Sequence, residues 1–415
     1  MKRIAIQPRA GWQAKLDALG FDWHTVPSPE DPAGTYWDES AYWRLTAEEV
    51  DRLEEATNEL HTMCLAAADA AISRRLLPHF GFSPEAIALI EDSWRNRGEQ
   101  PSLYGRFDLA FAGLDVGDGQ PKMLEYNADT PTGLYEAAVV QWTWLEELFP
   151  DSDQFNSLHE GLVEVWRKVR MHLGDDVAVH LTCLMPHAED EGTLRYVLDT
   201  ALEAGLTAKM IALEEIGWSA PSDEPEAGEF TDLEDTVIKT LFKIVPWEWL
   251  LADEFGPRLA RATMKREMTV IEPAWKMIVA NKAILALLWE MYPDHPYLLP
   301  AYMDRSQFAA GSKVVAKPLL GREGANISIA ELGEGGAVVG APIANMDGKY
   351  GDEGYVYQAL TPLAAATDAQ GRSHNAVIGS WVIDGVSRGI GIREDTGLIT
   401  HNRSRFVPHL FEAEG

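Results

Sequence analysis

The sequence predicts a mixed fold of the class α/β (α+β), and three patterns carry this prediction. A long helix-spaced run precedes an alternating β-hairpin, a strand, a helix and a strand follow one another in mid-chain, and short strands surround a glycine-rich loop near the C-terminus. The 415 residues are 46% hydrophobic and 24% charged, which is a globular composition, and this length suggests about two or three lobes. A sizeable core is therefore expected.

The first strong element is a helix over residues 46–77. Thr46 is a suitable N-cap, and a glutamate follows it three residues later, which is the capping-box pattern. Apolar residues recur at helical spacing, at Val50, Leu53, Leu60, Met63 and Leu65. The segment is therefore expected to form one long helix.

A β-hairpin is expected next. In YGRFDLAFAG apolar residues alternate with polar or small ones, and the turn DVGDGQ separates this stretch from KMLEYNAD. Antiparallel partners across a short turn face each other. The hairpin is therefore expected to bring Arg106 and Asp108 beside Glu125 and Asn127.

The rest of the chain alternates between helices, strands and loops. The expected elements are helices over 131–149, 191–205 and 281–293, strands over 177–185, 207–213, 313–318, 327–332 and 355–360, and exposed loops over 219–230 and 367–375. The helix that ends at Gly205 lies between two strands, which is an α/β pattern. The later short strands carry the Gly-rich loop 319–327, so they indicate a small lobe that covers a nucleotide.

Charge and the lack of targeting patterns limit the function classes. The net charge of −30, from 65 acidic and 35 basic residues, repels nucleic acid and anionic membranes and attracts cations, although solubility alone also explains such acidity. No stretch approaches the roughly 18 to 20 apolar residues of a membrane helix, and the start MKRIAIQPRAGW lacks a signal-peptide core. We expect a cytoplasmic protein that binds neither nucleic acid nor membrane. Cys64 and Cys183 lack metal-ligand spacing and are expected to be buried apolar side chains.

Polar residues of the expected hairpin suit a hard metal ion. Asp108, Glu125 and Asn127 all offer oxygen atoms, and Mg²⁺ bound to nucleotide phosphates typically takes one or two protein carboxylates, with phosphate oxygens and water completing its shell. The alternative is that Glu125 and Asn127 are ordinary polar residues at a strand end, with Asp129 capping a turn. These residues alone leave both interpretations open.

Cationic residues later in the chain suit an anionic ligand. Lys317 ends the strand VVAKP, and GREG follows, whose glycines Gly321 and Gly324 let backbone N–H groups approach a phosphate. The lysine precedes the glycines, which excludes a Walker A loop. The alternative to a phosphate-binding loop is an ordinary surface turn. Lys282 lies in an Ala- and Leu-rich helix, where solvent exposure is the alternative. Arg393, on an alternating strand, is suited to clamp a transferring phosphoryl group.

Seven segments together resemble the glutathionylspermidine synthase family, and in particular its single-domain bacterial members. They are RFDLAF, LEYNADTPT, EPAWKMIVANKAIL, LLPAY, VAKPLLGREGANI, YVYQAL and GIREDTGLITHNRSRF, and the similarity runs in order from about residue 10 to about residue 410. The resemblance implies an ATP-grasp-type fold with a pre-ATP-grasp-like N-terminal region and a small nucleotide-covering lobe. It implies one catalytic unit over 1–410, made of a metal and substrate lobe over about 1–270 and a nucleotide-binding lobe over about 271–410.

The resemblance also implies an activity. The family's reaction is that of a carboxylate–amine ligase: with ATP and Mg²⁺ a carboxylate is phosphorylated, and an amine then displaces phosphate to leave an amide. We expect small-molecule substrates, with glutathione, a peptide or an amino acid as the acid and a polyamine as the amine, and the sequence leaves the oligomeric state open. The competing hypothesis is an ATP-binding regulatory or binding module of the same fold without ligase turnover.

Residue by residue, the resemblance assigns a site. The matched positions are Asp108, Glu125 and Asn127 for the metal, Lys282 and Lys317 with the loop glycines Gly321 and Gly324 for the nucleotide, Gln358 and Leu360 for adenine through their backbone, Arg106 and Arg393 for the transferring phosphate, Thr130 and Thr132 for the substrate carboxylate, and Asp190 and Glu191 for the amine. Arg393 matches an arginine on a mobile C-terminal loop. Asp190 and Glu191 also suit an ordinary helix start, which is the alternative for this pair.

The chain departs from the family pattern in three places. Bifunctional members carry an N-terminal amidase domain with a Cys and His pair, whereas this chain begins at the synthetase region, so no hydrolytic half is expected. Pro131 stiffens the loop between the two matched threonines. Ile244 and Trp249 stand where the glutathionylspermidine-forming enzymes have threonines that touch glutathione, which puts glutathione itself in doubt as the acid.

Overall fold

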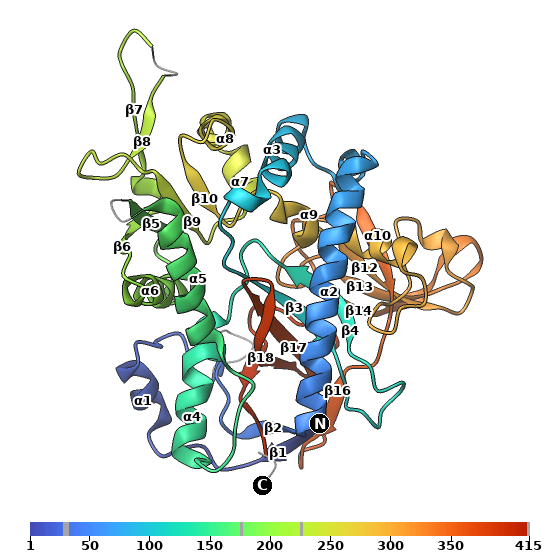
Figure 1. Ribbon diagram of the computed structural model, residues 1–415. Helices are drawn as coiled ribbons and strands as arrows, with labels where there is room; N and C mark the ends of the chain where they lie inside the picture. The colour runs from blue at the N-terminus through green and yellow to red at the C-terminus, as the bar shows by residue number, and fades with distance from the viewer. Residues whose placement is uncertain (28–32, 175–176, 225–226, 413–415) are drawn as a thin grey trace.

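The computed structural model describes residues 1–27, 33–174, 177–224 and 227–412. A six-stranded sheet runs through the middle of the molecule in the order β19-β18-β17-β3-β4, with β16 beside β17 (Figure 1). The bounds are Tyr104–Ala110 (β3), Lys122–Asn127 (β4), Ala364–Thr367 (β16), Ser373–Ile383 (β17), Val386–Asp395 (β18) and Arg405–Val407 (β19). This sheet joins strands from both sides of residue 270, and the division of the chain at that point stays a prediction.

The predicted hairpin is confirmed as β3 and β4. In its antiparallel register Arg106 lies opposite Asn127, and Asp108 lies opposite Glu125. Residues that face each other across two strands, and residues two apart on one strand, share a face of the sheet. On the other side of β3, Gly379 leaves room for Arg106, because a Cβ at this glycine would lie 2.7 Å from the arginine Cδ. The four polar side chains therefore lie on one face.

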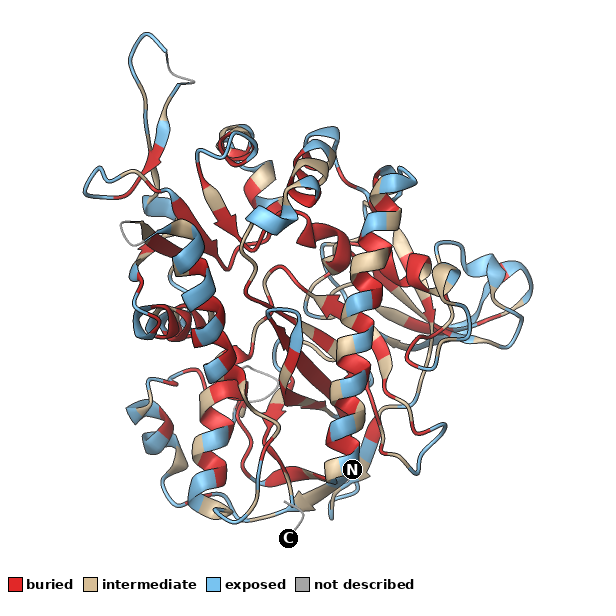
Figure 2. Ribbon diagram, viewed as in Figure 1, coloured by how far each residue is buried: buried red, intermediate tan, exposed pale blue. Residues whose placement is uncertain are grey.

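The predicted long helix is confirmed as α2, Ala47–Ser73. Thr46 and Glu49 form the capping box: the threonine hydroxyl accepts the glutamate N–H at 3.2 Å, and the glutamate carboxylate accepts the threonine N–H at 3.0 Å. The helix packs against β17 and β18. Figure 2 shows buried residues concentrated on these central strands, while exposed residues lie along the outer side of α2. The predicted apolar positions are buried except Leu65, which is partly buried.

The predicted strand, helix and strand in mid-chain are confirmed within a second, parallel sheet of order β10-β9-β5-β6. Its strands are Ala178–Cys183 (β5), Thr207–Ala212 (β6), Thr240–Lys243 (β9) and Thr269–Ile271 (β10), and the crossover helix α6 is Ala188–Glu203. Helix α5, Leu158–Leu173, packs beside α6. The predicted loop 219–230 joins the short strands Gly217–Ser219 (β7) and Glu229–Thr231 (β8), and its residues 225–226 lie outside the described residues.

A five-stranded sheet forms the predicted small lobe, in the order β11-β15-β12-β13-β14. The bounds are Ala301–Tyr302 (β11), Lys313–Pro318 (β12), Ser328–Leu332 (β13), Val338–Asn345 (β14) and Tyr355–Ala359 (β15). The strands predicted over 313–318, 327–332 and 355–360 are therefore confirmed to within one residue. The Gly-rich loop connects β12 to β13.

Besides the predicted long helix, which ends at Ser73 and not at residue 77, three predicted elements have corrected boundaries. The helix expected over 281–293 is α10, Ile284–Met291, so Lys282 lies in the turn that follows α9, Lys276–Ala280. The helix expected over 131–149 begins only at a π-helical turn, Glu136–Val140, and continues as α4, Gln141–Leu148. The expected loop 367–375 is shorter, because strand β17 has already begun at residue 373.

The chain ends meet in a three-stranded sheet of order β1-β2-β20. Its strands are Lys2–Ala5 (β1), Ala41–Leu45 (β2) and His409–Phe411 (β20), and the remaining helices are Trp12–Ala18 (α1), Pro84–Arg95 (α3), Trp247–Ala252 (α7) and Gly256–Met264 (α8). Cys64 and Cys183 are free and buried, as expected. Over the described ranges, no helix combines the length and the apolar character needed to cross a membrane.

Candidate active site

A cavity between the central sheet and the small lobe collects most of the predicted nucleotide and metal residues. Its walls come from β4, β12, β15, the Gly-rich loop and the segment 398–400. The predicted residues that line it are Asp108, Glu125, Lys282, Lys317, Gly321, Gly324, Gln358 and Leu360. These residues are separated by up to 252 positions along the chain, so the fold brings them together from four distant segments.

The two carboxylates of this cavity are held by neighbours on the same face. Both oxygens of Asp108 accept hydrogen bonds from Arg106, from Nε at 2.7 Å and from Nη2 at 3.2 Å. Glu125 accepts from the amide nitrogen of Asn127 at 3.0 Å and pairs with Lys282 Nζ at 3.0 Å. The side chains of Asp108 and Glu125 remain 18% and 22% exposed towards the cavity. They are thus accessible to a ligand.

The two predicted lysines are buried. Lys282 is only 6% exposed and donates to the carbonyl of Gly321 at 2.6 Å, so the interpretation of a solvent-exposed helix lysine was wrong. Lys317 is 5% exposed and donates to the carbonyl of Leu124 at 2.7 Å and to the side chain of Gln358 at 2.8 Å. Both ammonium groups therefore link the small lobe or its loop to strand β4.

The charges of these groups shift one another's pKa. Burial raises the pKa of Asp108, and the neighbouring Glu125 raises it further, against the lowering effect of Arg106. For Glu125 burial also acts upwards, but Lys282 and Lys317 outweigh it and lower its pKa to about 2. Burial lowers the pKa of Lys317 to about 8, opposed by Glu125 and reinforced by Lys282. Glu125 and Lys317 are therefore both charged at neutral pH.

The Gly-rich loop presents backbone donors to the cavity. The N–H groups of Gly321 and Ala325 are used by the carbonyls of Pro318 and Arg322. Within the described part of the chain, no acceptor is found for the N–H groups of Arg322, Glu323 and Gly324. Gly324 has φ 72, and a Cβ there would lie 2.6 Å from the carbonyl oxygen of Thr400. Three successive N–H groups without an acceptor suit an anion, and the role of this loop towards a phosphate stays a prediction.

The strand predicted to bind adenine has fewer free backbone hydrogen-bonding groups than expected. The N–H groups of Ala359 and Leu360 donate to the carbonyls of Pro300 and Lys313 within the lobe. Gln358 is buried, and its side-chain amide donates to Met123 at 2.9 Å. An N–H contact from Leu360 to a base would therefore have to replace an existing hydrogen bond, whereas the side chain of Leu360 already lines the cavity.

Arg393 lies on strand β18, whereas the resemblance suggested a mobile loop. Its guanidinium donates to the carbonyls of Ser404 at 3.0 Å and His401 at 2.8 Å and lies 5.3 Å from the centre of the Tyr36 ring. It thereby holds the loop between β18 and β19, whose residues 398–400 line the cavity. The geometry makes Arg393 an anchor of this loop, and its role towards a phosphate stays a prediction.

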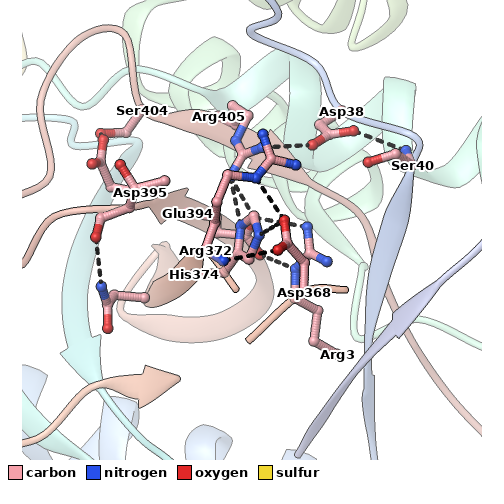
Figure 3. Close-up of polar contacts among 12 residues, drawn as sticks. Arg3, Asp38, Ser40, Asp368, Arg372, His374, Glu394, Asp395, Ser404 and Arg405 are labelled. Atoms are coloured by element: carbon pink, nitrogen blue, oxygen red, sulfur yellow. Dashed lines mark hydrogen bonds and ion pairs between the residues drawn. The ribbon is translucent and has the colours of Figure 1, made fainter. Parts of the chain in front are cut away.

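The next residue on β18 points the other way into a charged cluster (Figure 3). Glu394 is fully buried and accepts from Arg3 Nε at 2.7 Å, from Trp43 Nε1 at 3.1 Å and from Arg405 Nη2 at 2.9 Å, and its Oε1 lies 2.8 Å from His374 Nδ1. This Glu394 cluster ties β18 to the N-terminal strand and to β19. It therefore fixes the strand from which Arg393 extends.

A smaller adjoining cavity contains the predicted acid-binding threonine Thr130, together with Asn127, Lys282 and Gly321. Here the hydroxyl of Thr130 accepts from Arg322 Nη1 at 2.9 Å, and Nη2 of the same arginine pairs with Glu248 at 2.6 Å. The second threonine, Thr132, offers its carbonyl to Arg106. The predicted substrate loop therefore connects Arg106 on one side with Arg322 on the other.

Asp129, which the sequence left without a role beyond a turn cap, forms a buried structural contact. Its carboxylate pairs with Lys243 Nζ at 2.5 Å and accepts the N–H of Trp247 at 3.0 Å. Both side chains of this ion pair are almost fully buried. The contact fastens the substrate loop to the carboxyl end of β9.

The two residues predicted to bind the amine, Asp190 and Glu191, have different surroundings at the start of α6. Glu191 makes local contacts, accepting the N–H of His187 at 3.0 Å and pairing with Arg195 at 3.1 Å, as the helix-start alternative describes. Asp190 pairs with His187 at 3.4 Å, and the pKa of Asp190 is raised, mainly by burial and also by Glu323 of the Gly-rich loop. The preceding residue, Glu189, faces Glu136 and Thr132, and its pKa is raised to about 7, first by burial and then by Glu136.

Sequence reasoning missed Arg322, Glu189 and Glu136. Glu136 is fully buried: its Oε1 accepts from Trp23 at 3.0 Å and Tyr36 at 2.7 Å, while its Oε2 has no partner among the described residues. Arg322 stands inside the GREG motif, so its position between two glycines was a usable signal. Glu136 and Glu189 lie in ordinary helical stretches, and nothing in the local pattern separates them from surface acids.

The predicted metal set fits Mg²⁺ by its donor chemistry. Asp108, Glu125 and Asn127 place two carboxylates and an amide on one face, and the like charge of Glu125 raises the pKa of Asp108, a cost that a cation would relieve. Across the described residues, no group of three or more His, Cys, Asp or Glu side chains is placed to hold a metal. A magnesium ion here would therefore share its coordination with water or with phosphate.

Comparison with known proteins agrees with this fold. The sequence matches the glutathionylspermidine synthase preATP-grasp family over residues 3–412, so the chain belongs to this family and its fold is of the ATP-grasp type. It is 40% identical over 416 residues to a Haemophilus influenzae protein that bears the provisional name acid–amine ligase, covering 99% of this chain and 100% of that one. Membership and this full-length relative identify the enzyme class as a ligase that forms a carbon–nitrogen bond.

More distant relatives are longer proteins. The bifunctional glutathionylspermidine synthetase/amidase of Escherichia coli is 26% identical over 389 residues, covering 88% of this chain, and the trypanothione synthetase of Crithidia fasciculata is 26% identical over 394 residues, covering 86%. The chain spans 58% and 57% of their lengths. Among solved structures, a glutathione synthetase-like effector from Globodera pallida aligns over 97% of both chains with a TM-score of 0.57 at 8% identity. This likeness concerns the fold alone.

Proposed function

We propose that the protein is an ATP- and Mg²⁺-dependent ligase that joins the carboxylate of a small acid to an amine. The observation that carries this proposal is the single cavity in which the carboxylates Asp108 and Glu125 meet the buried lysines Lys282 and Lys317 beside the Gly-rich loop and its three N–H groups without an acceptor. Such a set positions and neutralises phosphates, which is most of what phosphoryl transfer asks of a protein. The division into lobes over 1–270 and 271–410 belongs to the same proposal.

Each group has a distinct task in this reaction. When bound, Mg-ATP supplies the phosphoryl group that converts the acid into an acyl phosphate, and Asp108, Glu125 and Asn127 would hold the metal. Lys282, Lys317 and the loop N–H groups neutralise the phosphates. Arg106 is kept in place by both oxygens of Asp108 and reaches the substrate loop at Thr132, where it orients the acid carboxylate.

The amine is proposed to approach from the side of α6. The new carbon–nitrogen bond replaces the carbon–oxygen bond to phosphate, and phosphate leaves with the bonding electrons and takes up the proton that the nitrogen loses after its attack on the acyl carbon. Before this attack the ammonium has to lose one proton. Glu189, whose pKa of about 7 lies near neutral pH, is suited to hold the ammonium and accept that proton. Thr130 and Thr132 keep the acid beside it, and Asp190 adds negative charge at the same helix start.

Phosphate release from ATP tests the proposed function. Purified protein with Mg²⁺ is offered glutathione, dipeptides and amino acids, each with and without spermidine or a simple diamine, and release above the acid-free background is expected for at least one acid and amine pair. Nucleotide binding is measured in parallel by calorimetry. If Mg-ATP binds but no pair raises release, the ligase function is wrong and the nucleotide-binding module without turnover replaces it.

A further inference from the structure

A second cavity, of about 390 Å³, lies at the carboxyl ends of parallel strands β5, β6 and β9. Leu184 follows β5, Leu213 follows β6 and Val245 follows β9, and all three line the cavity. Ligands of open α/β sheets bind in crevices outside the carboxyl ends of the strands. The size is also within the range of small-molecule sites, about 300 to 1,000 Å³. The cavity therefore has the location and the size of a ligand site.

The walls of this cavity are apolar, and its rim is negative. Trp249 and Leu184 are 45% and 37% exposed, which leaves a large aromatic and an aliphatic surface uncovered. Glu214, Asp253 and Glu254 are also among its lining residues and are here called its acidic rim. An occupant should therefore be apolar in its body and should carry a positive charge, or none, where it meets the rim.

Two segments connect this cavity to the proposed acid site. On helix α7, Glu248 binds Arg322 in the cavity of Thr130, and the next residue, Trp249, lines the apolar cavity. The segment after β5 does the same: Leu184 lines the apolar cavity, and Glu189, five residues on, interacts with Thr132. The two cavities are thus neighbours: one contains Arg322 and Lys282 together with Glu248, and the other is apolar with an acidic rim.

We infer that the acid substrate is a short apolar peptide. Its carboxylate lies beside Arg322 and Thr130, its side chains cover Trp249, and its amino-terminal ammonium meets the acidic rim. A tripeptide such as glutathione fits this charge order less well, because it carries a second carboxylate at the end opposite to the one that reacts. This inference rests on the proposed ligase function and adds to it the class of acid.

Trapping with hydroxylamine tests the inference without knowledge of the natural amine. Hydroxylamine nitrogen bonds to the acyl carbon, phosphate leaves and a proton is released, so the hydroxamate reports activation of the acid alone. The acids are Gly-Gly, Leu-Leu, N-acetyl-Leu-Leu and glutathione, each with Mg-ATP. We expect kcat/KM for Leu-Leu to exceed that for Gly-Gly by about tenfold or more, since each buried apolar side chain contributes appreciably to binding. Acetylation, which removes the ammonium, should lower the Leu-Leu value.

Variants then locate the preference. Trp249→Ala should reduce the ratio of Leu-Leu to Gly-Gly by about tenfold, and Trp249→Phe should restore most of it. Trp142, also exposed at 37% but on helix α4, provides the control Trp142→Ala, for which the ratio should not change. A ratio that Trp249→Ala leaves unchanged, or a preference for glutathione, would overturn the inference while the ligase stands. No hydroxamate from any acid would instead overturn the proposed function and the inference with it.

Discussion

Glu125 on β4 and Glu394 on β18 are carboxylates of the same central sheet with opposite surroundings. Glu394 is fully buried, and both of its oxygens accept hydrogen bonds from nitrogen donors of other strands. Glu125 is 22% exposed in a cavity and faces a second carboxylate, Asp108, across the hairpin. Both carboxylates have each oxygen paired, since Glu125 accepts from Asn127 and pairs with Lys282, so the difference lies in exposure and in the neighbouring charge. A fully buried and paired carboxylate holds a fold together, whereas a paired one that is exposed in a cavity beside a like charge is available to a ligand.

Replacing Glu125 should give the largest functional effect. Glu125→Gln keeps the shape of the side chain but removes the charge that faces the lysines and the proposed metal. We expect ligase turnover to fall by about 10³-fold, which corresponds to about 4 kcal/mol in the activation barrier. The free energy of unfolding should change by only about 1 kcal/mol, because the group is partly solvated. Phosphate release and urea denaturation on the same preparation measure both, and unchanged turnover would remove Glu125 from the site.

Replacing Glu394 should reverse this pattern. Glu394→Gln leaves Arg3 and Arg405 without their buried anion, and losing one partner of a buried charge network is costly. We expect the free energy of unfolding to fall by about 3 kcal/mol, while turnover per folded molecule stays within a few-fold of the wild type at low temperature. Urea denaturation gives the first quantity. A variant that keeps full stability but loses turnover would show that the Glu394 cluster acts in the reaction.

The same contrast explains what could be predicted from the sequence. The face shared by Asp108, Glu125 and Asn127 follows from the period of a strand and from a short turn, which are local features. The N-cap at Thr46 and the strand that ends at Lys317 are local as well. The order of short segments along the chain then identified the family.

Features that depend on distant partners could not be read in this way. For Lys282 the local pattern of helix formers left solvent exposure open beside a nucleotide role, but the side chain is buried and contacts the carbonyl of Gly321 and the carboxylate of Glu125. Which of the successive acids at the start of α6 faces Thr132 depends on where the helix begins, and boundaries are the least certain part of a sequence prediction. The buried ion pair between Asp129 and Lys243 could not be predicted either, because the two residues are distant in the sequence.

The arginines of the Glu394 cluster and Lys317 of the candidate active site should respond differently to pH. Arg3 and Arg405 of the Glu394 cluster stay charged at any ordinary pH, but the pKa of Lys317 is lowered to about 8, mainly by burial. Its positive charge is therefore complete below pH 7 and is lost as the pH rises through 8. If Lys317 neutralises a phosphate, nucleotide affinity should fall by about tenfold between pH 7.5 and 9.5, with about half a proton taken up on binding at pH 8 and uptake approaching one proton at higher pH.

Calorimetry in two buffers of different ionisation enthalpy measures both the affinity and the proton uptake. Lys317→Arg is the matched control, because an arginine keeps its charge over this range and should remove the pH dependence even if it binds the nucleotide less tightly. The linkage has the opposite sign for folding: the unfolded chain holds this proton more tightly, so the contribution of Lys317 to stability rises between pH 8 and its ordinary pKa of 10.5. Affinity that falls while stability does not is therefore the specific signature of a buried site lysine, and an affinity independent of pH would place the phosphate elsewhere.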